Sequence, residues 1–251
     1  MVKGVELKNS KGLTLRGILQ IPDQDWNGMI VAMFHGFTGN KTEHAYHFRN
    51  FARKACDNGI ATVRFDYSGN FESDGEFADM TFATLIEETN LILDFAKSVE
   101  GVKELIALGY SMGGSLAAYC SARRNDVDKM ILWNPAGNMD VLIKTRYESG
   151  TPDEKGEVAF APLFHLSKEM YETAGWYHPY EGLTAYKNPV IIISGLKDQS
   201  VPHEYAARYA LCFQGSFLHL VQTAGHGFDS PAEAQEVYEK SISFLKRDFK
   251  I

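Results

Sequence analysis

An apolar run leads directly into a glycine-bracketed serine in residues 105–115, which read LIALGYSMGGS. The run is typical of a strand buried on both faces of a parallel sheet, because such strands are continuously apolar rather than alternating. Gly109, Ser111 and Gly113 form the pattern G-x-S-x-G, and residues 115–119 continue as a helix. A tight strand-to-helix turn needs glycine on either side of its serine, since a Cβ there would clash with neighbouring backbone. The stretch therefore predicts a nucleophilic serine at a helix N-terminus.

Buried-strand patterns recur along the chain and alternate with helix-length segments. Further apolar runs occupy residues 29–34, 60–65, 130–133 and 190–193, with a weaker one at 217–221. The helix-length segments are residues 43–58, 81–98, 111–124, 203–213 and 232–247. Residues 5–21 alternate and contain glycines, which indicates an antiparallel hairpin at one edge. This order predicts an α/β fold with a doubly wound, mostly parallel sheet and helices on both faces.

Residues 137–185 interrupt this alternation. They show no clean strand–helix unit and are rich in aromatic side chains. Structureless loops of this length are usually functional caps or disordered, and the aromatic content argues against disorder. We expect residues 1–136 and 186–251 to form the core, with residues 137–185 inserted as a cap after the sixth strand. Its aromatic residues either wall a pocket for an acyl group or bury the cap on the core.

Composition and charge narrow the class of protein. The chain has 251 residues, is 45% hydrophobic and 23% charged, and carries a net charge of −7. An acidic chain without a basic stripe is a poor partner for nucleic acid or anionic membranes. No apolar run approaches the ~18 residues that span a bilayer, and residues 1–8 mix charges where a signal peptide needs an apolar stretch. Three widely spaced cysteines indicate free thiols and no thiolate metal site. We therefore expect a cytoplasmic location.

A serine nucleophile needs a base, and the base needs a carboxylate that orients it. Asp198 follows the apolar run 190–193, and His226 lies between two glycines just after the run 217–221. Both residues therefore emerge at the same carboxyl edge of the sheet as Ser111. The order serine, aspartate, histidine is the one found with a strand–serine–helix turn. We expect Ser111, Asp198 and His226 to form a catalytic triad.

A tetrahedral intermediate also needs two N–H donors aimed at its oxyanion. Met112 supplies one by its position directly after the nucleophile. The other is expected from residues 35–39, the loop after the first fully buried strand, and Phe37 is the predicted donor. His35, in the same loop, is interpreted as structural.

Over essentially its whole length the sequence resembles the α/β-hydrolase superfamily, and within it the bacterial cinnamoyl (feruloyl) esterases. The resemblance is carried by HGFTG at 35–39, GYSMG at 109–113, Asp198 and GHG at 225–227. The esterases also share the strand end RFD, here residues 64–66, and a cap after the sixth strand. Residues 69–75 differ, because they read GNFESDG where the esterases usually have a Gly-His-Gly-x-Ser motif.

The resemblance implies an esterase that acts on hydroxycinnamate esters. It also implies that Tyr171 and Asp140 in the cap contact the phenolic part of the substrate, and Trp176 is a further candidate among the cap aromatics. The mechanism needs no metal and no organic cofactor, and its partner is a small-molecule ester.

Other functions remain compatible with the same residues. A lipase-like, thioesterase or peptidase-type hydrolase would use the same triad on another substrate. A non-catalytic binding protein would keep the fold without the reaction, although such proteins usually have a broken triad. The sequence also leaves open whether the chain forms a homodimer.

Overall fold

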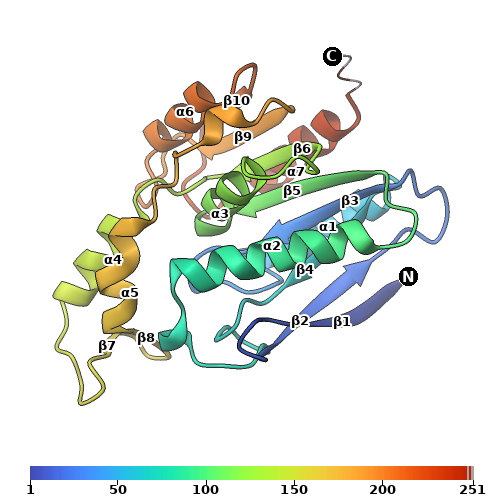
Figure 1. Cartoon of the computed structure of the whole chain (residues 1–251). Helices are drawn as coiled ribbons and strands as arrows, with labels where there is room; N and C mark the ends of the chain where they lie inside the picture. The colour runs from blue at the N-terminus through green and yellow to red at the C-terminus, as the bar shows by residue number, and fades with distance from the viewer. Residues whose placement is uncertain (248, 250–251) are drawn as a thin grey trace.

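A computed structural model of the protein describes residues 1–247 and 249 (Figure 1). Within these residues, eight strands form one sheet in the order β1-β2-β4-β3-β5-β6-β9-β10. The strands are β1 (Val2–Lys8), β2 (Thr14–Gln20), β3 (Met29–Phe34), β4 (Ala61–Phe65), β5 (Glu104–Tyr110), β6 (Lys129–Trp133), β9 (Val190–Gly195) and β10 (Phe217–Val221). β2 pairs antiparallel with β1 and β4, and the remaining pairs are parallel. The predicted edge hairpin and mostly parallel sheet are thus confirmed.

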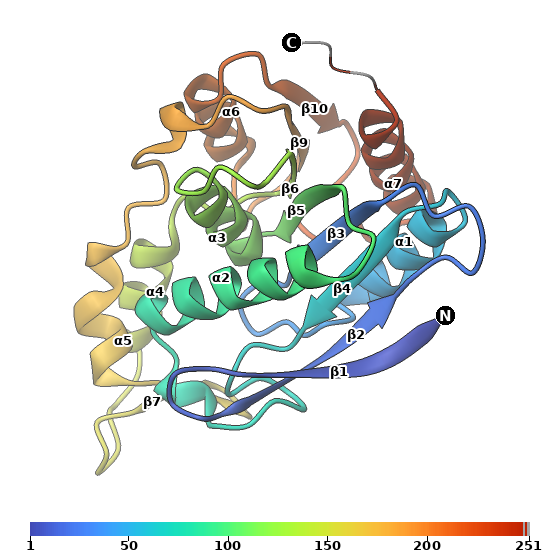
Figure 2. The same ribbon diagram turned by 45° about the vertical axis from the view of Figure 1, so that its right-hand side comes forward.

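Helices cover both faces of this sheet (Figure 2). They are α1 (His47–Cys56), α2 (Phe82–Ser98), α3 (Met112–Ser121), α6 (His203–Cys212) and α7 (Pro231–Leu245), with a 3-10 turn η2 (Phe77–Asp79) before α2. Side chains of β3 alternate between two cores: Ala32 and Phe34 pack with α2 and α3, whereas Val31 and Met33 pack with α1 and α7. Because both faces of β3 are covered, its sequence is continuously apolar.

The ends of the helices follow from local hydrogen bonding. α2 begins at a capping box, in which the side chain of Thr81 accepts from the N–H of Thr84 and the side chain of Thr84 accepts in return. α7 begins with the same arrangement between Ser230 and Glu233. The predicted helix 43–58 begins later than expected. Its first residues form a 3-10 turn, η1 (His44–Tyr46), with positive φ angles that no α-helix can contain, so α1 starts at His47.

The segment between β6 and β9 has more regular structure than the sequence predicts. It contains α4 (Met139–Glu148), a hairpin of β7 (Val158–Ala161) and β8 (Phe164–Leu166), α5 (Lys168–Thr173) and the 3-10 turns η3 (Ala174–Trp176) and η4 (Leu183–Ala185). Figure 1 shows α4, α5 and the hairpin together at one end of the sheet. Only Met139 and Ile143 of α4 are buried, which leaves too weak an apolar pattern to reveal the helix.

Two aromatic contacts fix this inserted segment to the core. Tyr177 is buried, stacks on Phe82 of α2 with ring centroids 4.3 Å apart, and shares a 2.7 Å hydrogen bond with Ser115 of α3. Phe160 of β7 stacks on Phe37 at 5.6 Å. The first contact reaches the helix that follows Ser111, and the second reaches the loop that contains the predicted oxyanion donor.

In the described part of the chain, none of the helices combines the length and the apolar character that crossing a membrane requires. Cys56, Cys120 and Cys212 are free thiols. Burial raises the pKa of the Cys120 thiol to about 12, which makes it unreactive at neutral pH.

Candidate active site

Ser111 lies at the turn between β5 and α3, in a strained backbone conformation. Its φ of 54° and ψ of −120° are rare for a residue with a side chain and cost about 1–3 kcal/mol. A Cβ on Gly109 would lie 2.1 Å from the carbonyl oxygen of Gly113, and one on Gly113 would lie 2.0 Å from that of Phe34. Both glycines are therefore required by close backbone approach, as the sequence predicts.

The structure brings the three predicted triad residues together. Nε2 of His226 lies 3.1 Å from Oγ of Ser111, and its Nδ1 lies 2.6 Å from Oδ2 of Asp198. The other carboxylate oxygen of Asp198 accepts from the N–H groups of Ser200 and Val201, at 2.9 and 2.8 Å. The Asp198 side chain is fully buried, and all its partners donate to it. These distances are within the range for proton transfer from a hydroxyl to a base.

Two further side chains hold the loop that carries His226. The carbonyl oxygen of His226 accepts from the hydroxyl of Tyr110 at 2.6 Å and from the side-chain amide of Asn134 at 2.8 Å. The amide oxygen of Asn134 accepts from the N–H of Gly195 at the end of β9. Sequence reasoning missed both supporting residues. The signals are the position of Tyr110 inside the G-x-S-x-G pattern and that of Asn134 at a strand end.

The predicted oxyanion donors have free N–H groups. Neither the N–H of Phe37 nor that of Met112 finds an acceptor within residues 1–247 and 249. A Cβ on Gly36 would lie 3.3 Å from Cβ of Ser111, so the loop with Phe37 runs directly against Ser111. His35 is fully buried, and its Nε2 accepts from the N–H of Tyr67, which fits the predicted structural role.

A pocket of about 480 Å³ opens beside Ser111 and His226. Its lining includes residues 36–40 together with Glu43, His44 and Asp229. Nε2 of His44 is 2.7 Å from a carboxylate oxygen of Asp229. Every lining residue comes from outside the inserted segment. Glu43, His44 and Asp229 add ionisable groups to this lining, and sequence reasoning did not single out these three residues.

The three predicted substrate contacts lie outside this pocket. The Trp176 side chain is 77% exposed. The hydroxyl of Tyr171 donates to a carboxylate oxygen of Glu148 at 2.8 Å. Asp140 lines a separate pocket together with Tyr180. The structure does not bring Asp140, Tyr171 or Trp176 to Ser111, and their contact with a substrate stays a prediction.

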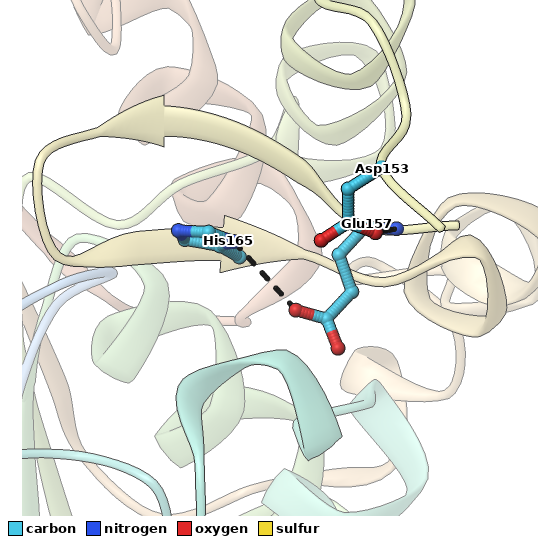
Figure 3. A group of neighbouring side chains, drawn as sticks. All are labelled: Asp153, Glu157 and His165. Atoms are coloured by element: carbon cyan, nitrogen blue, oxygen red, sulfur yellow. Dashed lines mark hydrogen bonds and ion pairs between the residues drawn. The ribbon is translucent and has the colours of Figure 1, made fainter. Parts of the chain in front are cut away.

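A group of potential metal ligands lies on the inserted segment, namely Asp153, Glu157 and His165 (Figure 3). One ligating atom from each residue lies within 4.8 Å of the others. Local bonding accounts for this grouping: Oδ1 of Asp153 accepts from the N–H groups of Lys155 and Glu157, and Glu157 lies 3.6 Å from the ring nitrogen of His165. The group braces the loop before β7 and gives no independent sign of a metal.

The sequence profile of the family described as serine aminopeptidase, S33, matches residues 27–170. Two Escherichia coli proteins, each named "Uncharacterized 31.7 kDa protein in traX-finO intergenic region", are 26% identical over 176 residues. That match covers 69% of this chain but 58% of either relative, so the chain spans less than two thirds of their length.

Solved structures share the fold over nearly the whole chain. Est1E from Butyrivibrio proteoclasticus, in a structure with ferulic acid bound, has a TM-score of 0.84 and 22% identity, covering 97% of this chain and 100% of that one. Alpha/beta hydrolase domain-containing protein 10 from mouse has a TM-score of 0.74 and 22% identity, covering 97% and 98%. The chain therefore has the α/β-hydrolase fold and belongs to the family described as serine aminopeptidase, S33.

Proposed function

We propose that the protein is a serine esterase that cleaves small carboxylic esters with Ser111, His226 and Asp198. One observation carries the proposal: the imidazole of His226 bridges the Ser111 hydroxyl and the buried Asp198 carboxylate, at 3.1 and 2.6 Å. A hydroxyl so placed, at a strained turn beside a pocket, is the arrangement of an activated nucleophile.

The reaction follows from this geometry. His226 takes the proton of Ser111 as Oγ attacks the ester carbonyl carbon, and Asp198 stabilises the imidazolium that forms. The N–H groups of Phe37 and Met112 bind the oxyanion, each contributing about 3 kcal/mol to lowering the barrier. His226 then gives its proton to the leaving alcohol as the C–O bond breaks. A water molecule, deprotonated by His226, releases the acid from the acyl-enzyme and restores Ser111.

For the substrate, we propose hydroxycinnamoyl esters of the feruloyl type. The HGFTG loop at residues 35–39 resembles that of the cinnamoyl esterases, and Est1E, whose structure has ferulic acid bound, shares the fold. A pocket of about 480 Å³ is large enough for part of such an ester, since small-molecule sites occupy about 300–1,000 Å³.

A second candidate is a peptidase-type reaction with the same three residues. It is favoured by the family profile, which is described as a serine aminopeptidase. In both reactions Ser111 attacks the carbonyl carbon. The two differ in the leaving group that His226 protonates, which is an alcohol in the esterase and an amine in the peptidase.

A substrate panel separates these possibilities. Purified protein would be assayed on p-nitrophenyl acetate, methyl ferulate, a medium-chain acyl ester, an acyl-CoA and an aminoacyl p-nitroanilide, with Ser111→Ala as the control. We expect Ser111-dependent ester hydrolysis, with methyl ferulate among the better substrates. Preference for the anilide would favour the peptidase. Unchanged turnover in a folded Ser111→Ala variant, or no labelling of Ser111 by a fluorophosphonate, would reject the mechanism.

A further inference from the structure

A second carboxyl group is buried at the edge of the Ser111 pocket, on Glu43. The residue is 7% exposed and belongs to the pocket wall. Its Oε2 accepts a 2.7 Å hydrogen bond from the N–H of Gly36, and its Oε1 accepts a 2.9 Å bond from the N–H of His44. Each carboxylate oxygen therefore has a main-chain donor, one on either side of the loop that contains Phe37.

The loop is folded closely around this carboxyl group. Gly36, which donates to Glu43, directly precedes Phe37, and the carbonyl oxygen of Gly36 accepts from the N–H of Gly39 at 3.0 Å. A Cβ on Gly39 would lie 3.0 Å from Oε1 of Glu43. An oxyanion donor is effective only when its direction is fixed before the reaction. The bond from Gly36 to Glu43 fixes the peptide next to the one that presents the Phe37 N–H.

Glu43 occupies this place at a cost to folding. Its φ of 62° is unfavourable for a residue with a Cβ. Burial raises the pKa of its carboxyl, although the N–H groups of Gly36 and His44 act in the opposite direction. Backbone strain and a buried ionisable group at a pocket are typical of functional sites rather than of scaffolding.

We propose that Glu43 is a positioning residue for the reaction of Ser111: its carboxylate fixes the loop that presents the Phe37 N–H. This inference rests on the proposed esterase function.

The chain offers a matched control for Glu43. Glu88 on α2 is 1% exposed, and burial raises the pKa of its carboxyl as well. It accepts from the N–H of Ser68 at 3.0 Å and from the side-chain amide of Asn9 at 2.8 Å. Glu88 is not part of the Ser111 pocket. Glu88→Gln therefore makes the same chemical change, at similar burial, without touching the proposed reaction.

The experiment compares Glu43→Gln, Glu43→Asp and Glu88→Gln with the wild type in kcat and KM for p-nitrophenyl acetate, each corrected for the fraction of folded protein. For Glu43→Gln we expect kcat to fall by about ten- to a hundredfold, since a donor is displaced rather than removed, with KM within about threefold. Glu43→Asp keeps the carboxylate but shortens its reach to the N–H groups of Gly36 and His44, so kcat falls here too. Glu88→Gln leaves both kcat and KM unchanged.

Three results would overturn the inference. The first is a folded Glu43→Gln variant with wild-type kcat. The second is a fall in kcat of the same size in Glu88→Gln as in Glu43→Gln, once both are corrected for the fraction of folded protein. The third applies if Glu43→Gln does not fold, and is a folded Glu43→Asp variant with unchanged kcat. A different result would reject the esterase function itself, namely turnover at the wild-type rate in the Ser111→Ala variant.

Discussion

The hydroxyl of Tyr110 donates a 2.6 Å hydrogen bond to the main-chain carbonyl oxygen of His226. Tyr110 is the last residue of β5 and directly precedes Ser111. The strand that ends at the proposed nucleophile therefore also holds the loop that carries the proposed base. This bond helps to set the distance between Ser111 and His226 before any substrate binds. Such preorganisation of the reacting groups lowers the barrier of the reaction.

Tyr110→Phe should lower kcat for p-nitrophenyl acetate by about tenfold, because a small misplacement of a catalytic group is costly. The lost hydrogen bond should also cost about 1 kcal/mol of stability. Tyr186→Phe is the control, since its buried hydroxyl donates to the carbonyl oxygen of Val127 at 3.1 Å, away from the pocket. Steady-state kinetics and urea unfolding check both variants. Equal kcat values in the two would show that the Tyr110 bond has no catalytic consequence.

Gly113→Ala should prevent the turn at Ser111 from forming. The new Cβ would lie 2.0 Å from the carbonyl oxygen of Phe34, so the strand or the helix must move. We expect a loss of about 3 kcal/mol or more in the free energy of unfolding, measured in urea. Gly4→Ala, where a Cβ meets nothing within 4 Å, should stay within about 0.5 kcal/mol of the wild type. Similar stabilities for the two variants would contradict the close packing of the turn.

Asp74 should make the edge hairpin sensitive to acid. A hydrogen bond from the Arg16 guanidinium, helped by the N–H of Thr14, lowers the pKa of Asp74 to about 2. Because this folded-state pKa lies below the usual value of about 3.9, ionised Asp74 stabilises the folded state. That contribution is complete above about pH 5 and disappears as the pH falls toward 2.

Asp74→Asn removes this titration. The free energy of unfolding, measured in urea at a series of pH values, should then fall less steeply between about pH 5 and pH 2 than it does in the wild type. An unchanged slope would mean that Asp74 titrates alike in the folded and unfolded chains.

Tyr177→Ala should detach the inserted segment from α2 and α3. The change removes a buried ring that stacks on Phe82 and a hydrogen bond to Ser115, so we expect a loss of about 3–5 kcal/mol. Trp176→Ala, one residue away at a side chain that is 77% exposed, should change stability by no more than about 0.5 kcal/mol. Thermal unfolding of both variants tests the difference, which equal midpoints would contradict.

Trp176→Ala also tests the predicted substrate contact. A higher KM for methyl ferulate, with an unchanged KM for p-nitrophenyl acetate, would support a contact between Trp176 and the aryl group. Equal KM values for both esters in wild type and variant would remove Trp176 from the predicted substrate residues.

The parts of the fold predicted well from sequence are those where burial is uniform. Residues 29–34 and 217–221 were predicted as strands with the bounds that β3 and β10 have. The meeting of Ser111, Asp198 and His226 was also predictable, because parallel strands deliver their carboxyl ends to one edge and each residue follows such a strand.

The rest depends on contacts that leave no local pattern. The late start of α1 follows from positive φ angles at Ala45 and Tyr46, which nothing in their side chains requires. α4 buries little, so it lacks a strong apolar period. Asn134 acts through a hydrogen bond to the main chain of His226, which is far away in sequence, and Glu43 acts through one to the main chain of Gly36 within a tight loop. A polar residue at the start of a loop is too common for sequence alone to single it out.

Phe37 makes two separate contributions, one through its main-chain N–H and one through its ring. Its proposed chemical contribution is a main-chain amide that every residue except proline would supply, whereas its ring packs against the rings of Phe160 and Phe77, at 5.6 and 5.4 Å. Natural variation at this position would therefore follow the packing of the ring rather than the supply of the N–H donor. Replacing Phe37 by alanine would likewise not test the N–H donor, because alanine keeps the main-chain N–H and removes only the ring. Replacing the amide between Gly36 and Phe37 by an ester linkage would delete the donor and leave the ring untouched.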